Sequence, residues 1–161
     1  MTEATLALAL PDEAATERFA AVFAGLLPAD TRGWRVLLEG ELGAGKSTFA
    51  RALIRNLGHR GPVPSPTYTL VEPYELPGRQ VYHVDLYRIS SPEEVEYLGW
   101  SDWQDGLLLV EWPERAGQFL ATADLRMVLE YQGEGRRARL SALSDRGALL
   151  VQDIHKASLA F

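Results

Sequence analysis

The chain has 161 residues, of which 47% are hydrophobic and 24% are charged, and it contains no cysteine. This length and composition suit a single globular domain with a sizeable core, and the lack of cysteine excludes disulfide bonds and thiolate metal sites. The formal net charge of −6 argues against a broad surface that binds nucleic acid directly.

The sequence does not indicate membrane insertion or secretion. No apolar run approaches the roughly 20 residues that a membrane-spanning helix needs. The first residues also lack the basic segment and following apolar stretch of a secretory signal. We therefore expect a cytoplasmic protein with no membrane contact.

The first half of the chain alternates between strand and helix patterns. Residues 5–10 read as a strand, and residues 12 to about 27 read as a helix with Asp12 at its N-cap. Residues 34–39 form a short apolar run of strand character. Residues 48–57 then place apolar side chains at helical spacing and are followed by a glycine, which predicts a helix that ends there.

The middle of the chain adds a loop, a hairpin and a buried strand. Residues 61–66 are too rich in proline for regular structure. Residues 68–74 and 80–86 read as two strands of a hairpin, and residues 91–99 read as a short helix opened by a capping box. In the segment 106–110, a glycine is followed by four apolar residues, a pattern that is typical of a strand buried on both faces.

The C-terminal part predicts two more strands, at residues 125–131 and 137–143, joined by a glycine-containing turn. Residues 148–152 are either a final strand or the start of a helix. Strands interleaved with helices predict an α/β fold of the P-loop NTPase kind, with a mostly parallel central sheet, added antiparallel strands and helices on both faces. There is no repeat or long linker, so we expect residues 1–161 to form one domain.

A glycine-rich loop carries the strongest functional signal. Residues 40–47 read Gly-Glu-Leu-Gly-Ala-Gly-Lys-Ser, the G-x-x-x-x-G-K-[ST] phosphate-binding pattern, between a predicted strand and a predicted helix. The glycines let backbone N–H groups point at phosphate oxygens, and the helix N-terminus adds partial positive charge. Lys46 is expected to reach the phosphates and the Ser47 hydroxyl to bind Mg²⁺. The predicted nucleotide contacts of the loop are Glu41, Leu42, Gly43, Ala44, Gly45, Lys46, Ser47 and Thr48.

Two acidic side chains are candidates for the remaining chemistry. Glu111 follows an apolar strand, and at its carboxyl end it would lie beside the loop, where it could hold Mg²⁺; the alternative is an acid that only marks the end of the strand. Asp85 interrupts another apolar strand, where an unpartnered carboxylate would be unfavourable. It could hold a metal-bound water, polarise the attacking water, or pair with Arg88. His83 is interpreted as structural and is left out of the site.

The segment Ser65-Pro66-Thr67-Tyr68 is a candidate switch. Many P-loop hydrolases place a segment here whose hydroxyl senses the γ-phosphate and Mg²⁺. The flanking prolines reduce the entropy cost of holding Ser65 and Thr67 in place. The alternative is a rigid connector whose hydroxyls bond to its own backbone.

Taken together, these segments resemble the TsaE (YjeE) family, small bacterial P-loop ATPases needed for threonylcarbamoyladenosine formation in tRNA. The Ser-Pro-Thr-Tyr-Thr-Leu-Val and Asp-Leu-Tyr-Arg blocks are far more specific than the loop itself. The matching segments occur in family order and cover nearly the whole chain, at residues 10–13, 40–48, 64–74, 81–88, 111–113 and 135–136.

The resemblance implies a Mg²⁺-dependent ATP hydrolase that turns over weakly alone. Its implied partners are the threonylcarbamoyl-transferase subunit and its inactive paralogue, with tRNA contacted only indirectly. Ser47 and Glu111 look like the metal positions, although Ser47 replaces the commoner threonine. The catalytic positions would be Lys46, Asp85, Thr67 and Glu111, and further nucleotide contacts would be Glu114 and Arg136. The sequence leaves two other functions open: a small-molecule kinase, and a nucleotide-gated binding module without turnover.

Overall fold

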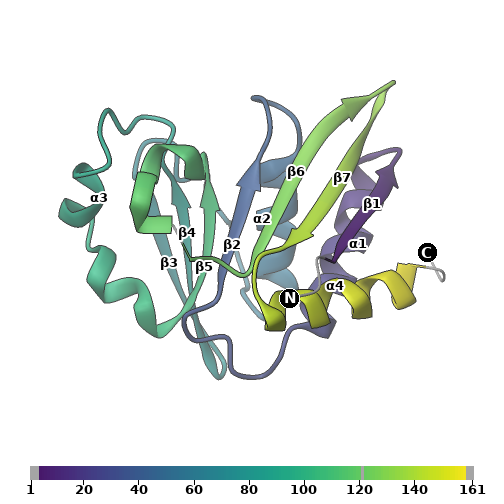
Figure 1. Cartoon of the computed structure of the whole chain (residues 1–161), viewed down its shortest axis with the longest axis horizontal. Helices are drawn as coiled ribbons and strands as arrows, with labels where there is room; N and C mark the ends of the chain where they lie inside the picture. Colours follow the sequence, from purple (N-terminus) through teal and green to yellow (C-terminus); the bar gives the residue numbers. More distant parts are fainter. Residues whose placement is uncertain (1–3, 121, 159–161) are drawn as a thin grey trace.

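In the computed structural model, which describes residues 4–120 and 122–158, the strands form one seven-stranded sheet in the order β1-β7-β6-β2-β5-β4-β3 (Figure 1). The strands are β1 (Thr5–Leu10), β2 (Arg35–Glu39), β3 (Val71–Leu76), β4 (Arg79–Asp85), β5 (Leu107–Glu111), β6 (Leu125–Gln132) and β7 (Gly135–Ala142). The helices are α1 (Glu13–Leu26), α2 (Lys46–Asn56), α3 (Glu94–Tyr97) and α4 (Asp145–Ser158), with 3₁₀ helices η1 (Trp100–Asp105) and η2 (Pro113–Leu120).

The centre of the sheet is parallel and its edges are antiparallel. Strand β2 pairs in parallel with both β5 and β6, and β4 pairs in parallel with β5. Strands β1, β7 and β3 are added in antiparallel pairs. The mixed α/β sheet predicted from the sequence is therefore confirmed. This arrangement brings the carboxyl ends of β2, β4 and β5 to one edge, where ligands bind in open α/β sheets.

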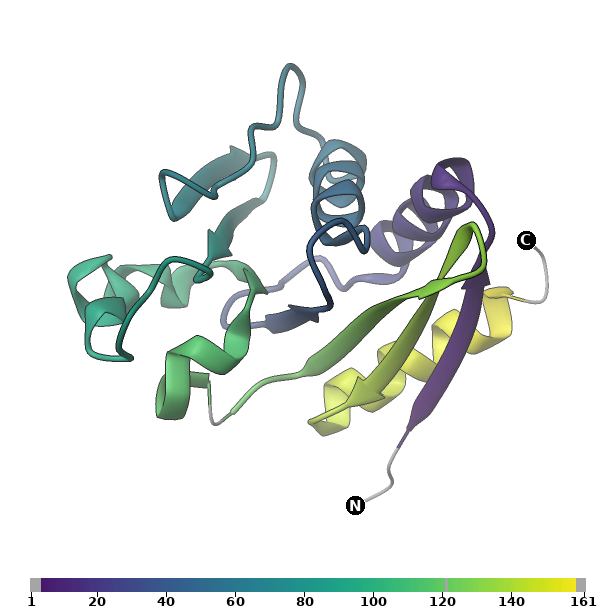
Figure 2. The ribbon, with the colours of Figure 1, turned by 90° about the horizontal axis from the view of Figure 1, so that it is seen from above.

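Helices cover both faces of the sheet, also as predicted. Helices α1, α2 and α4 share one apolar core with the sheet, and Figure 2 shows α1 and α2 side by side. In that core the ring of Phe49 lies 5.3 Å from the rings of both Phe19 and Phe23. The other face is covered by α3, η1 and η2, around Val95 and Trp103. The predicted cap of α1 is present, since Asp12 accepts a hydrogen bond of 2.8 Å from the Ala15 N–H.

Several element boundaries differ from the sequence predictions. We predicted a strand from residue 68, but β3 begins at Val71, because the preceding residues form turns and Leu70 has a left-handed backbone with φ of 70°. The predicted short helix at residues 91–99 is reduced to α3. Residues 148–152 lie within α4, so the helical alternative is correct. The 3₁₀ helices were not predicted, because such short segments leave no apolar period of 3.6 residues.

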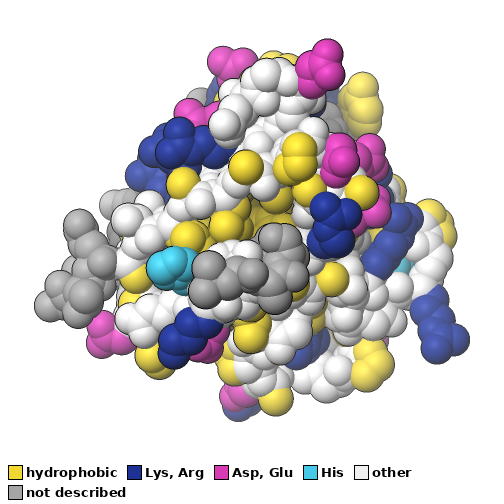
Figure 3. All heavy atoms as spheres, turned by 90° about the vertical axis from the view of Figure 1, so that its right-hand side faces the viewer, with side chains coloured by type: hydrophobic (Ala, Val, Ile, Leu, Met, Phe, Trp, Pro, Cys, Tyr) yellow, Lys and Arg dark blue, Asp and Glu magenta, His cyan; other side chains and the backbone are white. Residues whose placement is uncertain are grey.

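Charged side chains of both signs occur on the face of the molecule that carries β1 (Figure 3). On this face, viewed from the β1 edge, Lys and Arg side chains lie among acidic and apolar ones (Figure 3). Within the described ranges, none of the helices combines the length and the hydropathy needed to span a bilayer.

Asp124 joins β2, β6 and α4 at the amino edge of the parallel strands. Its side chain is buried and accepts hydrogen bonds from the Arg35 N–H at 2.9 Å and the Ser144 hydroxyl at 2.7 Å. The Arg146 guanidinium donates two more, at 2.8 and 3.1 Å. Burial alone would raise the pKa of Asp124, but the hydrogen bonds from Arg146, Arg35 and Ser144 outweigh it and lower the pKa. The carboxylate is thus stabilised as an anion in the folded state.

Replacing Asp124 with asparagine is expected to lower the free energy of unfolding by about 2–4 kcal/mol, because an amide cannot accept all of these hydrogen bonds and leaves buried donors unpaired. Urea denaturation at neutral pH measures this difference. Because the folded-state pKa is lowered, the contribution of Asp124 is present above its unfolded-state pKa of about 4 and is lost as the pH falls through the folded value. The free energies of unfolding of the wild type and the variant should therefore become similar in strong acid.

The matched control is Asp30→Asn, which removes the same charge from an exposed ion pair with Arg32. It should leave the urea midpoint nearly unchanged. An Asp124→Asn variant as stable as the control would show that the Asp124 network does not hold α4 to the sheet.

Candidate functional site

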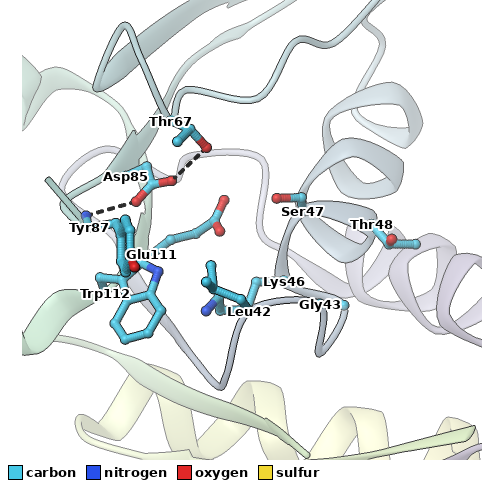
Figure 4. Close-up of a pocket in the computed structure, with 11 residues that line it drawn as sticks. Leu42, Gly43, Lys46, Ser47, Thr48, Thr67, Asp85, Tyr87, Glu111 and Trp112 are labelled. Atoms are coloured by element: carbon cyan, nitrogen blue, oxygen red, sulfur yellow. Dashed lines mark hydrogen bonds between the residues drawn. The ribbon is translucent and has the colours of Figure 1, made fainter.

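A cavity of about 380 Å³ opens at the carboxyl edge of the parallel strands. The glycine-rich loop between β2 and α2, with the start of α2, forms one wall, and Thr67 together with residues at and just after the ends of β4 and β5 forms the other (Figure 4). Its lining residues are Leu42, Gly43, Gly45, Lys46, Ser47, Thr48, Thr67, Asp85, Tyr87, Glu111 and Trp112. The fold thus brings together most of the residues that the sequence predicted for one site.

The loop has the backbone shape that its glycines permit. Gly40, Gly43 and Gly45 have positive φ angles of 146°, 81° and 109°. A Cβ atom on Gly40 would lie 2.4 Å from the Leu129 carbonyl oxygen, so only glycine fits against β6 at this position. At the other end, Gly45 precedes α2 and gives it no side-chain cap. The first N–H groups of α2 are therefore available to an anionic ligand.

Lys46 lies beneath Trp112 rather than in open solvent. Its side chain is buried, its Nζ donates a hydrogen bond to the Gly40 carbonyl, and the Nζ stands 4.1 Å from the Trp112 ring centroid. Burial lowers the pKa of Lys46, and the nearby carboxylates of Glu111 and Asp85 oppose that shift. Trp112 itself has a left-handed backbone, with φ of 56°.

Asp85 joins the cavity to the candidate switch segment. One carboxylate oxygen accepts a hydrogen bond of 3.2 Å from the Thr67 hydroxyl, and the other accepts one of 2.9 Å from the Tyr87 N–H. Burial raises the pKa of Asp85, and the negative charge of Glu111 adds to the effect. The Arg88 guanidinium instead lies over the ring of Tyr68, at 5.3 Å. Among the described residues there is no Asp85–Arg88 ion pair, so the structure does not support that alternative.

Glu111 is held by a histidine that the sequence analysis left out of the site. The Oε2 atom of Glu111 lies 2.6 Å from Nε2 of His83, and both side chains are buried. The other ring nitrogen of His83 is buried without a hydrogen-bond partner in the described part of the chain. Since His83 and Asp85 lie two residues apart on β4, their shared face next to the strand of Glu111 was the signal that could have revealed this contact.

Thr48 and Arg136 line a second, smaller cavity of about 160 Å³ on the other side of the loop. It lies between the loop, the start of α1 and the β6–β7 turn, and shares Gly43, Gly45 and Thr48 with the larger cavity. In Figure 4 the Ser47 hydroxyl faces the carboxylates, whereas the Thr48 side chain points away from them.

Three of the predicted nucleotide contacts line neither of these two cavities. They are Glu41, Ala44 and Glu114. Ala44 is buried, and its N–H donates a hydrogen bond of 3.0 Å to the Glu41 carbonyl within the loop. Their predicted contacts with a nucleotide stay predictions.

The fold and the site define an α/β protein whose glycine-rich loop joins a central parallel strand to a helix beside two buried carboxylates. A family model described as "Threonylcarbamoyl adenosine biosynthesis protein TsaE" matches residues 10–139 of the chain. The chain belongs to the TsaE family, as the sequence resemblance predicted.

Similar proteins agree with this assignment. The tRNA threonylcarbamoyladenosine biosynthesis protein TsaE of Haemophilus influenzae is 39% identical, over 88% of this chain and 92% of that protein. The protein of the same name from Synechocystis is 41% identical, over 73% of this chain and 76% of that protein. The crystal structure of YdiB from Bacillus subtilis superposes with a TM-score of 0.78 at 24% identity, covering 98% of this chain and 99% of that one, and shows the same fold.

Proposed function

We propose that this protein is a Mg²⁺-dependent ATPase that acts in the formation of threonylcarbamoyladenosine in tRNA. Membership of the TsaE family supports the pathway. The observation that carries the ATPase part is the placement of the Ser47 hydroxyl, at the N-terminus of α2, opposite the carboxylates of Asp85 and Glu111 (Figure 4). A phosphate chain in the loop would lie between positive helix amides and a pair of acidic groups.

The nucleotide would span the two cavities that meet at the loop. In this proposal the phosphates occupy the larger cavity, and the nucleoside occupies the smaller one beside Arg136. Lys46 would leave the Gly40 carbonyl and contact the phosphates, because their charge attracts an ammonium group more strongly than a neutral carbonyl does. Trp112 would then be released from Lys46.

The oxygen donors at the site suit Mg²⁺. The Ser47 hydroxyl and the Glu111 carboxylate are hard ligands, and Mg²⁺ normally takes one or two protein oxygens together with phosphates and water. No group of three or more His, Cys, Asp or Glu in the described ranges could hold a metal ion alone, which fits a metal that arrives with its nucleotide. Bound Mg²⁺ would neutralise charge on the phosphates.

Asp85 and Thr67 would link hydrolysis to the shape of the switch segment. Asp85 can accept a hydrogen bond from the attacking water and orient it. Thr67 is bonded both to Asp85 and, at 2.8 Å, to the Ser65 hydroxyl. Loss of the γ-phosphate would therefore change the conformation of residues 65–67. This conformational change would alter the affinity for partners.

We propose that these partners are the threonylcarbamoyl-transferase subunit and its inactive paralogue, and that tRNA is reached through them. The acidic balance of the chain supports indirect tRNA contact. Leu42, which lines the cavity, and Tyr68, which follows the cavity residue Thr67 in the chain, are 64% and 82% exposed, which suits a surface that a partner covers. The cytoplasmic location stays a prediction.

Phosphate release from ATP tests this function. The assay uses the isolated protein, then the protein with both partners and tRNA, and follows inorganic phosphate and modified adenosine together. Transfer of the labelled γ-phosphate to a small acceptor would favour a kinase. Binding without hydrolysis in a single-turnover assay of the assembled complex would favour a nucleotide-gated binding module.

Replacing Glu111 with glutamine is expected to weaken the Mg²⁺-dependent part of ATP binding by roughly 10- to 100-fold, the range typical of altered metal-site ligands and their supports. The reason is that a neutral amide attracts the metal less than a carboxylate does. Nucleotide titration with Mg²⁺ and with excess chelator separates the two contributions. Glu96→Gln, which makes the same change at an exposed position on α3, is the control. Equal Mg²⁺ dependence in both variants would remove Glu111 from the metal site.

A further inference from the structure

The β6–β7 hairpin flanks the outer side of the glycine-rich loop. Tyr131 on β6 and Arg136 on β7 are partners across the hairpin, and the Arg136 guanidinium lies 4.3 Å from the Tyr131 ring centroid. Tyr131 is 50% exposed, so its ring is not part of the apolar core. The role of Tyr131 must therefore be sought in what its hydroxyl contacts.

Both hairpin side chains bind carbonyl groups of the loop. The Tyr131 hydroxyl donates a hydrogen bond of 2.9 Å to the Leu42 carbonyl, and Arg136 donates one of 3.1 Å to the Gly43 carbonyl. A Cβ atom on Gly43 would lie 2.6 Å from the Tyr131 hydroxyl oxygen, so glycine permits this close approach. Two successive carbonyls of the loop are thus turned toward the hairpin.

The bound carbonyl groups fix the direction of the N–H groups that follow them, because each peptide unit is planar. In a trans peptide the C=O and the following N–H point in opposite directions. With the Leu42 carbonyl bound to Tyr131, the N–H of Gly43 points away from Tyr131. The next N–H, that of Ala44, is already used, because it donates to the Glu41 carbonyl at 3.0 Å. The Gly43 N–H is the one whose direction depends on Tyr131.

We propose that Tyr131 is a positioning residue for the phosphate-binding loop, fixing the Leu42–Gly43 peptide so that the Gly43 N–H faces the β-phosphate. The inference rests on the proposed function, since it assumes that a nucleotide binds in this loop. A glycine-rich peptide without this hydrogen bond has several accessible orientations, and a ligand would have to order it on binding. The Tyr131 hydroxyl provides that order before the nucleotide arrives.

The test is Tyr131→Phe, which removes one oxygen atom and keeps the ring beneath Arg136. The affinities for ADP and AMP are measured by competition against a fluorescent ADP, and the thermal midpoint is measured without ligand. We expect about tenfold weaker ADP binding, equivalent to about 1.4 kcal/mol, with AMP binding and the thermal midpoint unchanged. Tyr97→Phe removes the same oxygen from a side chain that is 90% exposed on α3, and should change none of these values.

The possible failures are distinguishable. Wild-type protein that binds no ADP would overturn the proposed function itself. Wild-type protein that binds ADP, with Tyr131→Phe binding it equally well, would overturn only the role of Tyr131. Equal weakening of AMP and ADP, or a lower thermal midpoint without ligand, would assign Tyr131 to structural support and also defeat the inference.

Discussion

Replacing Lys46 with alanine is expected to lower ATP hydrolysis, and with it sustained threonylcarbamoyladenosine formation, by on the order of 10²-fold or more. That loss is typical when a single charge-stabilising donor is removed from a transition state. In the structure the Lys46 ammonium is bound to a neutral carbonyl, and among the residues that line the larger cavity it is the one cationic side chain. In the proposed complex with ATP it would contact the phosphates instead. With alanine at this position, only the backbone N–H groups and the metal would stabilise the negative charge that develops in the transition state.

The fold should survive this change. Burial lowers the pKa of Lys46, which means that its charged form is held in the free protein at an energetic disadvantage. Thermal melts without ligand should therefore show no loss of stability for Lys46→Ala. Lys156→Ala removes the same charge from an exposed position on α4 and serves as the activity control. A Lys46→Ala variant that supports many rounds of modification would leave only a scaffolding role for ATP binding.

Assembly with the proposed partners is expected to accelerate ATP hydrolysis by about 10³–10⁵-fold, the effect of an arginine supplied in trans to known phosphoryl-transfer sites. The physical reason is a shortage of positive charge, because no arginine is among the residues that line the larger cavity. Single-turnover hydrolysis measures the rate for the isolated protein and for the complete complex with tRNA. Since Arg88 follows Asp85 closely in the chain, Arg88→Ala in the isolated protein is the informative comparison.

Two results would contradict this prediction. The isolated protein could hydrolyse ATP as fast as the complex, or Arg88→Ala could reduce the rate of the isolated protein as strongly as Lys46→Ala does. Either result would place the missing positive charge within this chain. The exposed position of Arg88, with its guanidinium over the Tyr68 ring, argues for the partner instead.

Much of the site could be predicted because it follows from sheet topology. Glu111 and Asp85 end neighbouring parallel strands, and the structure pairs them directly in register. The glycine-rich motif predicted the loop, because this motif has a fixed backbone shape. The apolar run at residues 107–110 predicted a central strand. These patterns are local in the sequence. The side chains they mark come together in space because the carboxyl ends of parallel strands lie at the same edge of a sheet.

The contacts that the sequence did not predict depend on long-range geometry. Tyr131 against Leu42 and Lys46 beneath Trp112 each join segments that no spacing rule relates. The contact of His83 with Glu111 could have been sought from strand alternation, but it also needs β4 and β5 to be neighbours in this register. The smaller cavity likewise forms where the start of α1 meets a distant hairpin. That residues 1–161 form one domain, and that the predicted side chains bind ATP, stay predictions.

The position of Asp124 has a practical use in protein engineering. It lies at the amino edge of the sheet, where it holds the start of β2 and α4, while the glycine-rich loop, Asp85 and Glu111 lie at the carboxyl edge, so mechanical support and the candidate site occupy opposite ends of the sheet. Substitutions for heat resistance can therefore be sought around Asp124 and α4 without altering the candidate site. A library confined to that edge is expected to vary thermal stability while leaving the residues of the candidate site in place.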